Sequence, residues 1–367
     1  MKIAIEAQRI FRPNKHGMDF VVLEILRVLQ RTDTENEFWV FVAPGEDVCL
    51  KDSANFHIVT LGSGFYPLWE QVLLPRAVRK LRPDLLHCTS NTAPLFPGCP
   101  LVVTLHDIIF LEKKTGSNSS TYQNLGRIYS RFVVPKVARR CQRLITVSNF
   151  EKGQITAAGV APAEKVSVIH NGFGTEFNTD AASQERDYLF FLGAPNPKKN
   201  TRGTLAAYAR YLDKSEKKLP LKIADLSEEN VKGYLEEICR PEILDHIECA
   251  GYIPHSELPK VYGGAAAFLY TSIRESFGIP QLEAMACATP TIVSNTSALP
   301  EVAGEGAILV DPLDPEQISD ALVRLETDAD FNAAAVAYGL ERVGQFSWEN
   351  SASKTIALYR KCLSKKI

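Results

Sequence analysis

Short apolar runs alternate with longer amphipathic segments along the chain, and this alternation leaves few folds open. Strand-length runs separated by helix-length segments are typical of parallel sheets whose two faces are covered by helices. We therefore expect an α/β protein built from doubly wound sheets. In the first part of the chain, the expected strands are Lys2–Glu6, Phe38–Val42, His57–Leu61, Leu85–Cys88, Leu101–Leu105, Arg143–Val147 and Lys165–His170.

The alternation stops at a polar, unpatterned stretch and then starts again. This stretch, Thr175–Asp187, is the candidate hinge between two domains. A chain of 367 residues is also too long for one ordinary core, which favours two domains. We predict the first domain over residues 1–174 and the second from residue 175 onward. The strands expected in the second domain are Tyr188–Leu192, Leu219–Ala224, Ile247–Ala250, Ala266–Tyr270 and Thr291–Ser294.

Composition excludes several classes of protein. With 45% hydrophobic and 23% charged residues, the chain has the mix of a soluble globular protein and not of a disordered one. Its eight cysteines form no Cys-x-x-Cys pair, which argues against a zinc site or a disulfide framework. No stretch has the roughly 18 apolar residues of a membrane span, and Glu6 argues against a signal peptide. These features predict a cytoplasmic protein.

The charge is distributed unevenly around a net value of -2. Residues 1–172 carry 21 Lys and Arg against 15 Asp and Glu, so this part is basic and the remainder is acidic. A protein that binds duplex nucleic acid needs a dominant positive field, and we therefore expect no nucleic-acid partner. The basic first part remains suited to an anionic surface or substrate.

The most informative stretch is Arg274–Glu283, which follows an expected strand and so lies at the carboxyl edge of a parallel sheet, where such folds bind ligands. Pro280 suits the first turn of a helix. The amides around Phe277–Ile279 would then offer a seat for a phosphate group. One of the carboxylates Glu275 and Glu283 could contact a sugar, and the other could accept hydrogen bonds from ribose hydroxyls. Alternatively, Glu283 only complements the helix dipole and Glu275 is solvated.

The same stretch resembles the donor-site signature of family 4 retaining glycosyltransferases. The signature runs from Glu275 through Glu283 to Pro290. Other segments that resemble this family are Val147–Phe150, Ile169–Gly172, Ser294–Gly304 and Leu309–Pro312. The resemblance covers nearly the whole chain and is most specific between Glu275 and Gly304.

The resemblance implies the GT-B fold, in which two Rossmann-like domains face each other across a cleft. The first domain, 1–174, would bind the acceptor, and the second, 175–347, would bind the nucleotide-sugar donor. The last helix, about 348–367, would pack back on the first domain. In this pattern Glu275 binds hydroxyls of the donor sugar and Glu283 binds the ribose. The donor-binding residues between them are Ser276, Phe277, Gly278 and Ile279.

A pair of lysines lies at another expected sheet edge, in the segment Gly193–Asn200. Lys198 and Lys199 could neutralise a departing nucleoside diphosphate in place of a metal ion. The resemblance matches Lys199 to the family's Lys-Asn pair, which implies a catalytic and donor-binding role, with Lys198 as a second contact. Many relatives carry Arg directly after the glycine, where this chain has Ala194. We expect no metal and no other cofactor.

In the first domain, His106 and Asp107 end the run Leu101–Leu105. From the residues alone, the first could be a packed histidine and the second a helix cap. The family places a histidine at this strand end to contact the donor sugar and its reacting face. The resemblance therefore implies a catalytic role for His106 and an acceptor contact for Asp107.

The loop after the first strand is Gly-rich in many relatives. Gly17 is retained here, which implies a donor contact, but Asp19 stands where a second glycine is common. We interpret Asp19 as a cap of the following helix. A second acidic motif, Asp328-Ala329-Asp330, matches the metal-binding string of the unrelated GT-A fold. It lies between amphipathic stretches, so we predict a helix start.

Basic residues in the first domain predict a surface contact. Four of them recur at helical spacing within Phe132–Leu144, namely Lys136, Arg139, Arg140 and Arg143. A similar patch, Arg76, Arg79 and Lys80, follows the aromatic cluster Phe65–Trp69. Such faces are usually only solvated. Because the first part of the chain is basic overall, we predict peripheral contact with an anionic membrane.

These features together predict a retaining, metal-independent glycosyltransferase. It would move a hexose, with mannose as the first candidate, from a GDP- or UDP-linked donor to a lipid-linked or oligosaccharide acceptor. The product would belong to a bacterial surface polysaccharide such as lipopolysaccharide, made in the cytoplasm at the inner face of the cell membrane. The alternatives are a nucleotide-sugar epimerase of the same fold, a two-lobed sugar-binding protein and a catalytically inactive regulator.

Overall fold

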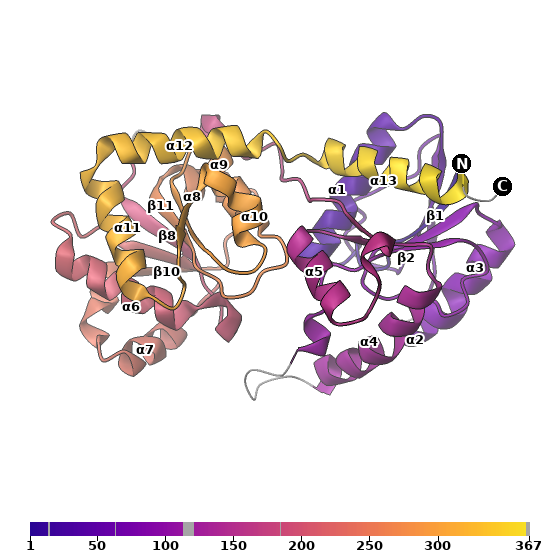
Figure 1. Ribbon diagram of the computed structural model, residues 1–367, viewed down its shortest axis with the longest axis horizontal. Helices are drawn as coiled ribbons and strands as arrows, with labels where there is room; N and C mark the ends of the chain where they lie inside the picture. Colours follow the sequence, from indigo (N-terminus) through magenta and orange to yellow (C-terminus); the bar gives the residue numbers. More distant parts are fainter. Residues whose placement is uncertain (14, 63, 113–120, 184, 365–367) are drawn as a thin grey trace. The chain divides into compact units, whose positions relative to one another are not determined.

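The computed structural model describes residues 1–364 except 14, 63, 113–120 and 184 (Figure 1). The chain divides into two compact units. The first unit comprises Met1–Gly172 and Ser347–Ile367, and the second comprises Phe173–Phe346. The chain therefore passes from one unit to the other twice, at positions 172/173 and 346/347.

The first unit is built on a parallel seven-stranded sheet in the order β3-β2-β1-β4-β5-β6-β7. Its strands are β1 (Lys2–Glu6), β2 (Glu37–Val42), β3 (Phe56–Thr60), β4 (Leu85–Cys88), β5 (Leu101–Thr104), β6 (Arg143–Thr146) and β7 (Val166–Val168). Its α-helices are α1 (Gly17–Thr32), α2 (Tyr66–Leu68), α3 (Leu74–Leu81), α4 (Thr121–Arg140), α5 (Asn149–Ala157) and α13 (Trp348–Ser364). The strand order reverses between β1 and β4, which marks the carboxyl ends of these strands as a ligand site.

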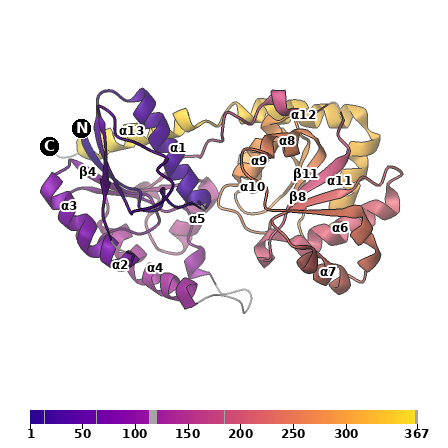
Figure 2. The ribbon, with the colours of Figure 1, turned by 180° about the vertical axis from the view of Figure 1, so that it is seen from behind.

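The second unit repeats this architecture with a parallel six-stranded sheet in the order β10-β9-β8-β11-β12-β13. Its strands are β8 (Tyr188–Leu192), β9 (Leu221–Ala224), β10 (Ile247–Gly251), β11 (Ala265–Tyr270), β12 (Thr291–Ser294) and β13 (Ile308–Val310). Its α-helices are α6 (Thr201–Lys214), α7 (Glu228–Glu237), α8 (Leu258–Gly263), α9 (Ile279–Ala286), α10 (Leu299–Ala303), α11 (Pro315–Thr327) and α12 (Ala329–Val343). The order reverses between β8 and β11. Within each unit, helices lie on both sides of the sheet (Figures 1 and 2).

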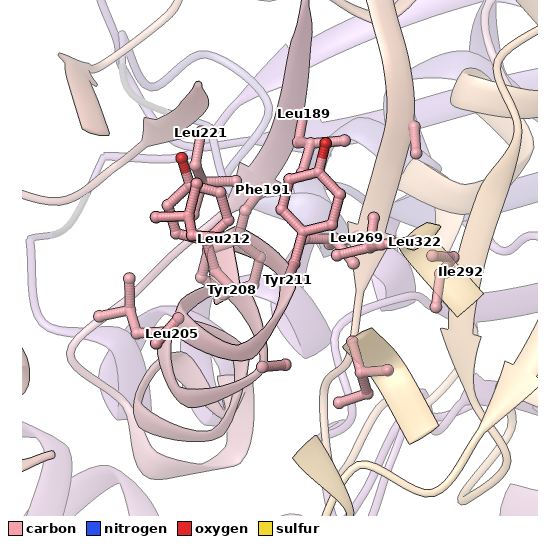
Figure 3. Close-up of a cluster of buried hydrophobic side chains, with 14 of the residues drawn as sticks. Leu189, Phe191, Leu205, Tyr208, Tyr211, Leu212, Leu221, Leu269, Ile292 and Leu322 are labelled. Carbon is pink, nitrogen blue, oxygen red and sulfur yellow. The ribbon is translucent and has the colours of Figure 1, made fainter. Parts of the chain in front are cut away.

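The cores explain why the strands are apolar along their whole length. All four residues of β5 are buried, because a sheet covered on both faces leaves no solvated side. In the second unit, Leu189 and Phe191 of β8 and Leu269 of β11 pack with Tyr208 and Tyr211 of α6 (Figure 3). The expectation of doubly wound α/β structure is confirmed.

The predicted basic helix face is wrong for one residue. Helix α4 ends at Arg140, and Arg143 is the first residue of β6. The last helical bond runs from the Cys141 N–H to the Val137 carbonyl over 2.8 Å. The next N–H, of Gln142, donates instead to the Leu101 carbonyl over 2.8 Å, so the chain leaves the helix for the sheet.

The predicted hinge is also wrong. Residues 175–187 belong to the second unit, where Thr179–Ala181 form a 3-10 turn. The Ser183 N–H donates to the Gly263 carbonyl at the end of α8 over 3.0 Å. A Cβ on Gly263 would lie 1.8 Å from the Ala181 carbonyl oxygen, so this segment packs closely on α8. Polarity indicated exposure here and not a joint between the units.

Candidate functional site

The carboxyl edge of the second sheet brings together two of the predicted site residues. Lys199 follows β8 and Glu275 follows β11, the two strands at which the strand order reverses. The ammonium of Lys199 lies 2.6 Å from Oε1 of Glu275. The same ammonium lies 5.5 Å from the centre of the Tyr270 ring. Side chains 76 positions apart in the sequence thus form one charged pair.

A tight turn positions the two lysines. Pro197–Lys199 form a 3-10 turn, and the Asn196 side chain accepts a hydrogen bond from the Lys198 N–H over 3.0 Å. The Lys198 carbonyl accepts from the Ile273 N–H over 2.7 Å, which ties the turn to the segment that carries Glu275. Both lysine side chains remain partly exposed.

The backbone of Glu275 is held at both ends. Its N–H donates to Oγ of Ser297 over 3.1 Å, and its carbonyl accepts from the Ala298 N–H over 3.3 Å. Its carboxylate also hydrogen-bonds to the Tyr270 hydroxyl. Burial, followed by the charge of Glu275, raises the pKa of Tyr270 well above its usual value, so this hydroxyl remains a donor. The carboxylate is therefore fixed by Lys199 on one side and Tyr270 on the other.

Helix α9 begins at the same edge, in the predicted phosphate seat. Gly278 caps the helix with φ +96°, and Pro280 lies in its first turn. A Cβ on Gly278 would lie 2.6 Å from Cδ2 of Leu299, so a side chain has neither the conformation nor the space. The first-turn amides of a helix lack intrahelical partners and carry partial positive charge. This turn is thus suited to an anion.

The residues around Gly278 differ in what they offer a ligand. Phe277 is buried, and its ring packs edge-on against Phe346 at 5.9 Å. Ser276 and Ile279 are half-buried. Of these predicted donor-binding residues, the side chain of Phe277 therefore belongs to the core, and only its backbone lies in the loop.

Glu283 lies one turn into α9 and is buried, with 6% of its surface exposed. The Tyr262 hydroxyl lies 3.4 Å from its Oε2, and Nε2 of His255 lies 3.4 Å from its Oε1. Sequence reasoning missed both neighbours. The signal available was the position of His255, shortly after β10 at the same sheet edge.

In the first unit, His106 is buried just after β5. Its Nε2 lies 3.0 Å from the Thr89 carbonyl, so this nitrogen carries the proton and donates. Burial lowers the pKa of His106, which keeps the ring neutral. His106 also lines a cavity of about 30 Å³ together with His87 and His170. The neighbouring Asp107 accepts from the Ile109 N–H over 2.9 Å, where a 3-10 turn begins.

The loop before α1 places Gly17 and Asp19 differently from a Gly-rich turn. Gly17 is the first residue of α1, and a Cβ there would meet no neighbouring atom. Asp19 is buried and accepts from the His16 N–H over 3.0 Å, which confirms its interpretation as a cap. Its other oxygen lies 3.1 Å from Nε of Arg9, a partner that sequence reasoning missed.

Glu6 is a buried acid that sequence reasoning did not select for the site. It ends β1, and its carboxylate accepts from the Gln8 N–H over 2.9 Å and the Thr89 N–H over 3.1 Å. Burial raises the pKa of Glu6 to about 7. The Thr89 backbone thus contacts both Glu6 and His106 at the strand-order reversal of the first sheet.

A separate surface of the first unit exposes apolar side chains. On α4, Leu125, Ile128 and Phe132 are 62%, 64% and 56% exposed and follow helical spacing. The ammonium of Lys136 lies 3.1 Å from the centre of the Phe132 ring. In the predicted aromatic cluster Phe65–Trp69, Phe65 is exposed but Trp69 is fully buried. We call the set Phe96, Leu125, Ile128, Phe132, Lys136 and Arg140 the α4 surface, in which the Arg140 guanidinium lies 5.0 Å from the centre of the Phe96 ring.

Two further features are absent from the described part of the chain. Residues 1–364, with the gaps given above, contain no cluster of three or more His, Cys, Asp or Glu side chains that could hold a metal ion. None of the helices in those residues is long and apolar enough to span a membrane. Asp328 of the acidic motif Asp328-Ala329-Asp330 caps α12 by accepting from the Phe331 N–H over 2.9 Å, as predicted.

Two family models match the chain in succession. Residues 16–177 match the model described as Glycosyltransferase Family 4, and residues 174–342 match the one described as Glycosyl transferases group 1. Among curated relatives, O-antigen chain mannosyltransferase B of Escherichia coli is 31% identical over 59% of this chain and 60% of its own length. O-antigen chain mannosyltransferase RfbU of Salmonella typhimurium is 28% identical over 76% of each chain.

Solved structures share the whole fold. Alr3699/HepE of Anabaena, in complex with UDP, matches with a TM-score of 0.74 and 18% identity over 98% of this chain and 100% of that chain. Sucrose-phosphate synthase from Thermosynechococcus elongatus matches with a TM-score of 0.75 and 19% identity over 100% of both chains. These similarities confirm the predicted GT-B architecture of two Rossmann-like domains. Motifs, fold and family models agree, and the chain belongs to the family 4, or group 1, glycosyltransferases.

Proposed function

We propose that this protein transfers a hexose from a nucleoside diphosphate sugar to a lipid-linked or oligosaccharide acceptor during bacterial surface polysaccharide synthesis. The observation that carries the proposal is the Lys199–Glu275 pair beside the first turn of α9. The Lys199 ammonium and the first-turn amides of α9 can bind a diphosphate, and the Glu275 carboxylate beside them can bind sugar hydroxyls. Mannose is the first candidate because the two relatives described above are named mannosyltransferases.

In this proposal the residues of the second unit bind the donor. Lys199, with Lys198 as a second contact, neutralises the diphosphate as its bond to the sugar breaks. The backbone from Ser276 to Ile279 receives a phosphate, and Glu283 accepts from the ribose hydroxyls. No divalent metal is needed, because Lys199 and the helix end supply the positive charge. Activity that persists in excess EDTA supports this assignment, and activity that requires added Mn²⁺ contradicts it.

The first unit supplies the acceptor side and the contact to the reacting sugar. His106 is neutral, and with its Nε2–H donated to Thr89 it offers Nδ1 as an acceptor. We assign it to the reacting face of the sugar, Asp107 to the acceptor and Gly17 to the backbone that approaches the donor. The transfer retains configuration: the anomeric C–O bond to the phosphate breaks, the acceptor oxygen bonds on the same face, and its proton passes to the leaving phosphate.

A thermal-shift panel tests the donor. Nucleotide binding raises the unfolding temperature in proportion to RT ln(1 + [L]/Kd), so the preferred base stands out among GDP, UDP and ADP. We expect a shift with one nucleotide and with its sugar conjugate. Absence of a shift with every nucleotide would contradict the proposal.

Product analysis separates the alternatives. An epimerase converts the nucleotide sugar without an acceptor, a sugar-binding protein binds free sugar without the nucleotide, and an inactive regulator binds the nucleotide without turnover. The proposed enzyme releases the free nucleotide in step with glycosylation of an added acceptor. The family assignment favours this last outcome.

We also propose that the first unit rests on an anionic membrane through the α4 surface. Exposed apolar side chains at helical spacing beside Lys136 and Arg140 are the pattern of an interfacial helix. The acceptor side would then work at the cytoplasmic face, next to lipid-linked substrates. Lys136 and Arg140 supply the charge that complements anionic headgroups.

Liposome flotation tests this contact. The full chain should float with vesicles that contain phosphatidylglycerol and not with phosphatidylcholine alone. The double variant Ile128→Ser, Phe132→Ser should stay in the dense fraction. Leu313→Ser is the matched control, because Leu313 is 72% exposed but lies in the second unit. The proposal would be refuted if the protein floated equally with both kinds of vesicle and the double variant floated like the parent.

A further inference from the structure

The second unit contains a cavity that is separate from the Lys199–Glu275 pair. It has a volume of about 180 Å³ and lies at the amino ends of β8 and β11, whereas Lys199 and Glu275 follow the carboxyl ends of those strands. Helices α6, α11 and α12 complete its wall. Leu189 and Tyr211, which line it, are labelled in Figure 3. No role in the proposed transfer is assigned to this cavity.

The wall of the cavity is largely apolar. The apolar residues that line it are Leu189, Leu219, Ala266, Ala267, Leu322 and Leu325. The volume is more than ten times the roughly 10–15 Å³ that a single water needs. An apolar group of several carbon atoms therefore fits, and its burial against these side chains is favourable.

Three charged groups line the cavity, and they do not balance. Arg186 and Lys217 are cations, and Glu326 is an anion. The oxygens of Glu326 accept from the Tyr211 hydroxyl and Ser215 Oγ over 2.7 Å each and from the Lys217 N–H over 3.3 Å. Burial opposes its charge, but these hydrogen bonds hold the pKa of Glu326 below its usual value. The carboxylate stays ionised and is already fully engaged.

Arg186 is the group left without an anion. Its side chain is half-buried, and none of the carboxylates in the described ranges forms an ion pair with it. Burial lowers the pKa of Arg186, although guanidinium remains charged at any physiological pH. A partly buried cation without a partner is unfavourable, and a bound anion would remove that penalty.

We propose that this cavity binds a small amphipathic anion: an aliphatic chain that ends in a carboxylate or a phosphate monoester. The chain lies among the leucines, and the head group pairs with Arg186 in the fork geometry that guanidinium offers to such anions. Lys217 adds a second positive charge at the rim. Two cations against one engaged carboxylate leave a net positive charge in the cavity wall, which favours an anion and excludes amines.

Isothermal titration of the full chain with four probes tests the class of ligand. Hexanoate and hexyl phosphate carry both a chain and an anion, acetate carries the anion alone, and 1-hexanol carries the chain alone. We expect at least one of the first two to bind at least tenfold more tightly than acetate and hexanol. Equal affinity for hexanoate, hexyl phosphate and hexanol would overturn the proposal.

Matched variants test the place of binding. Arg186→Gln should weaken the better probe at least tenfold, whereas Arg210→Gln should leave it unchanged, because Arg210 is an exposed arginine of α6 paired with Glu316. Ala266→Leu should also weaken it by filling the cavity, with thermal unfolding as the check that each variant is folded. Lys199→Ala should bind like the parent. A loss in Lys199→Ala together with full binding in Arg186→Gln would place the anion at the other sheet edge and refute the assignment.

Discussion

At the residue scale, Lys199 and Glu275 form a pair that can change partners. Both side chains are partly exposed, so a ligand can reach them without unfolding any element. A diphosphate at the first turn of α9 would compete for the Lys199 ammonium. Glu275 would then be released toward the sugar hydroxyls while Tyr270 keeps it in place. Donor binding would in this way prepare the carboxylate that positions the sugar.

Removing the ammonium tests this exchange. We expect Lys199→Ala to lower kcat/KM at least about tenfold, or roughly 1.4 kcal/mol of transition-state stabilisation. Lys198→Ala is the matched control and should lose less, because the backbone of Lys198, and not its side chain, ties the turn to Ile273. Steady-state rates with the donor found in the thermal-shift panel provide the measurement. A larger loss in the Lys198 variant would reverse the two roles.

Sequence motifs identify those site residues whose role is indicated by the few residues on either side of them. Lys199, Glu275 and Glu283 each lie within such a motif, and their proximity follows from the rule that parallel strands present one carboxyl edge. The partners Arg9 and Tyr262 were missed because nothing in their own neighbourhood marks them. Glu6 was missed as well, since its contact with Thr89 spans 83 positions and depends on strand order.

Glu6 gives the first unit a pH-dependent stability. Its folded-state pKa of about 7 lies above the usual value of 4.5, so the folded protein holds a proton that the unfolded chain releases. The contribution of Glu6 to the free energy of unfolding is therefore complete below pH 4.5. It is lost as the pH rises to about 7, by an amount on the order of 3 kcal/mol. His87, whose pKa burial lowers to about 3, acts in the opposite direction below its usual value of 6.5.

The comparison with Glu6→Gln isolates this effect. We expect the stability of the parent relative to Glu6→Gln to fall as the pH rises from about 4.5 to about 7. Urea unfolding followed by tryptophan fluorescence measures it, because Trp39, Trp69 and Trp348 all belong to the first unit. A difference between parent and variant that does not change with pH would show that Glu6 titrates normally.

At the element scale, sequence periodicity found the strands more reliably than the ends of helices. β1, β4, β8 and β12 have the predicted bounds, because continuous burial makes their apolar runs distinct. β13 was not predicted as a strand, and its burial is uneven, with Leu309 exposed. The end of α4 was misplaced because basic spacing continued past Arg140, while the backbone had already turned toward β6.

Helix α9 depends on the glycine at its cap. Gly278→Ala should destabilise the second unit by about 1–3 kcal/mol and weaken nucleotide binding, because the new Cβ meets Leu299 at a φ that favours glycine. Gly251→Ala is the matched control: Gly251 has φ +63°, but a Cβ there meets nothing within 4 Å. Hydrogen exchange of peptides from residues 173–346 compares the two. Equal losses would mean that backbone conformation alone sets the penalty.

At the scale of the whole molecule, the first unit is discontinuous in sequence and the second is not. Helix α13 comes after the entire second unit but belongs to the first. It packs on α1, and the Tyr359 hydroxyl lies 2.6 Å from Nδ1 of the buried His87. The alternating pattern predicted two sheets but not this return, which the family resemblance alone implied.

Truncation after Phe346 removes α13 and should therefore destabilise the first unit, although the second unit is adjacent to the cut in the sequence. We expect the first unit to lose cooperative unfolding, because the buried side chains of α13, among them Ile356 and Tyr359, leave its core. Residues 173–346 should keep their hydrogen-exchange protection. The milder Tyr359→Phe should cost the first unit about 1–2 kcal/mol in the full chain. A truncated chain whose remaining tryptophans still report a sharp transition would contradict this account.

The second unit, Phe173–Phe346, is one continuous segment inserted between the two parts of the first unit. Two splice points suffice to exchange it between relatives, and the exchange moves Lys199, Glu275 and Glu283 together. His106, Glu6 and the α4 surface keep their original neighbours. Under the proposed roles of the two units, recombination at these two positions would pair one parent's nucleotide preference with the other's acceptor.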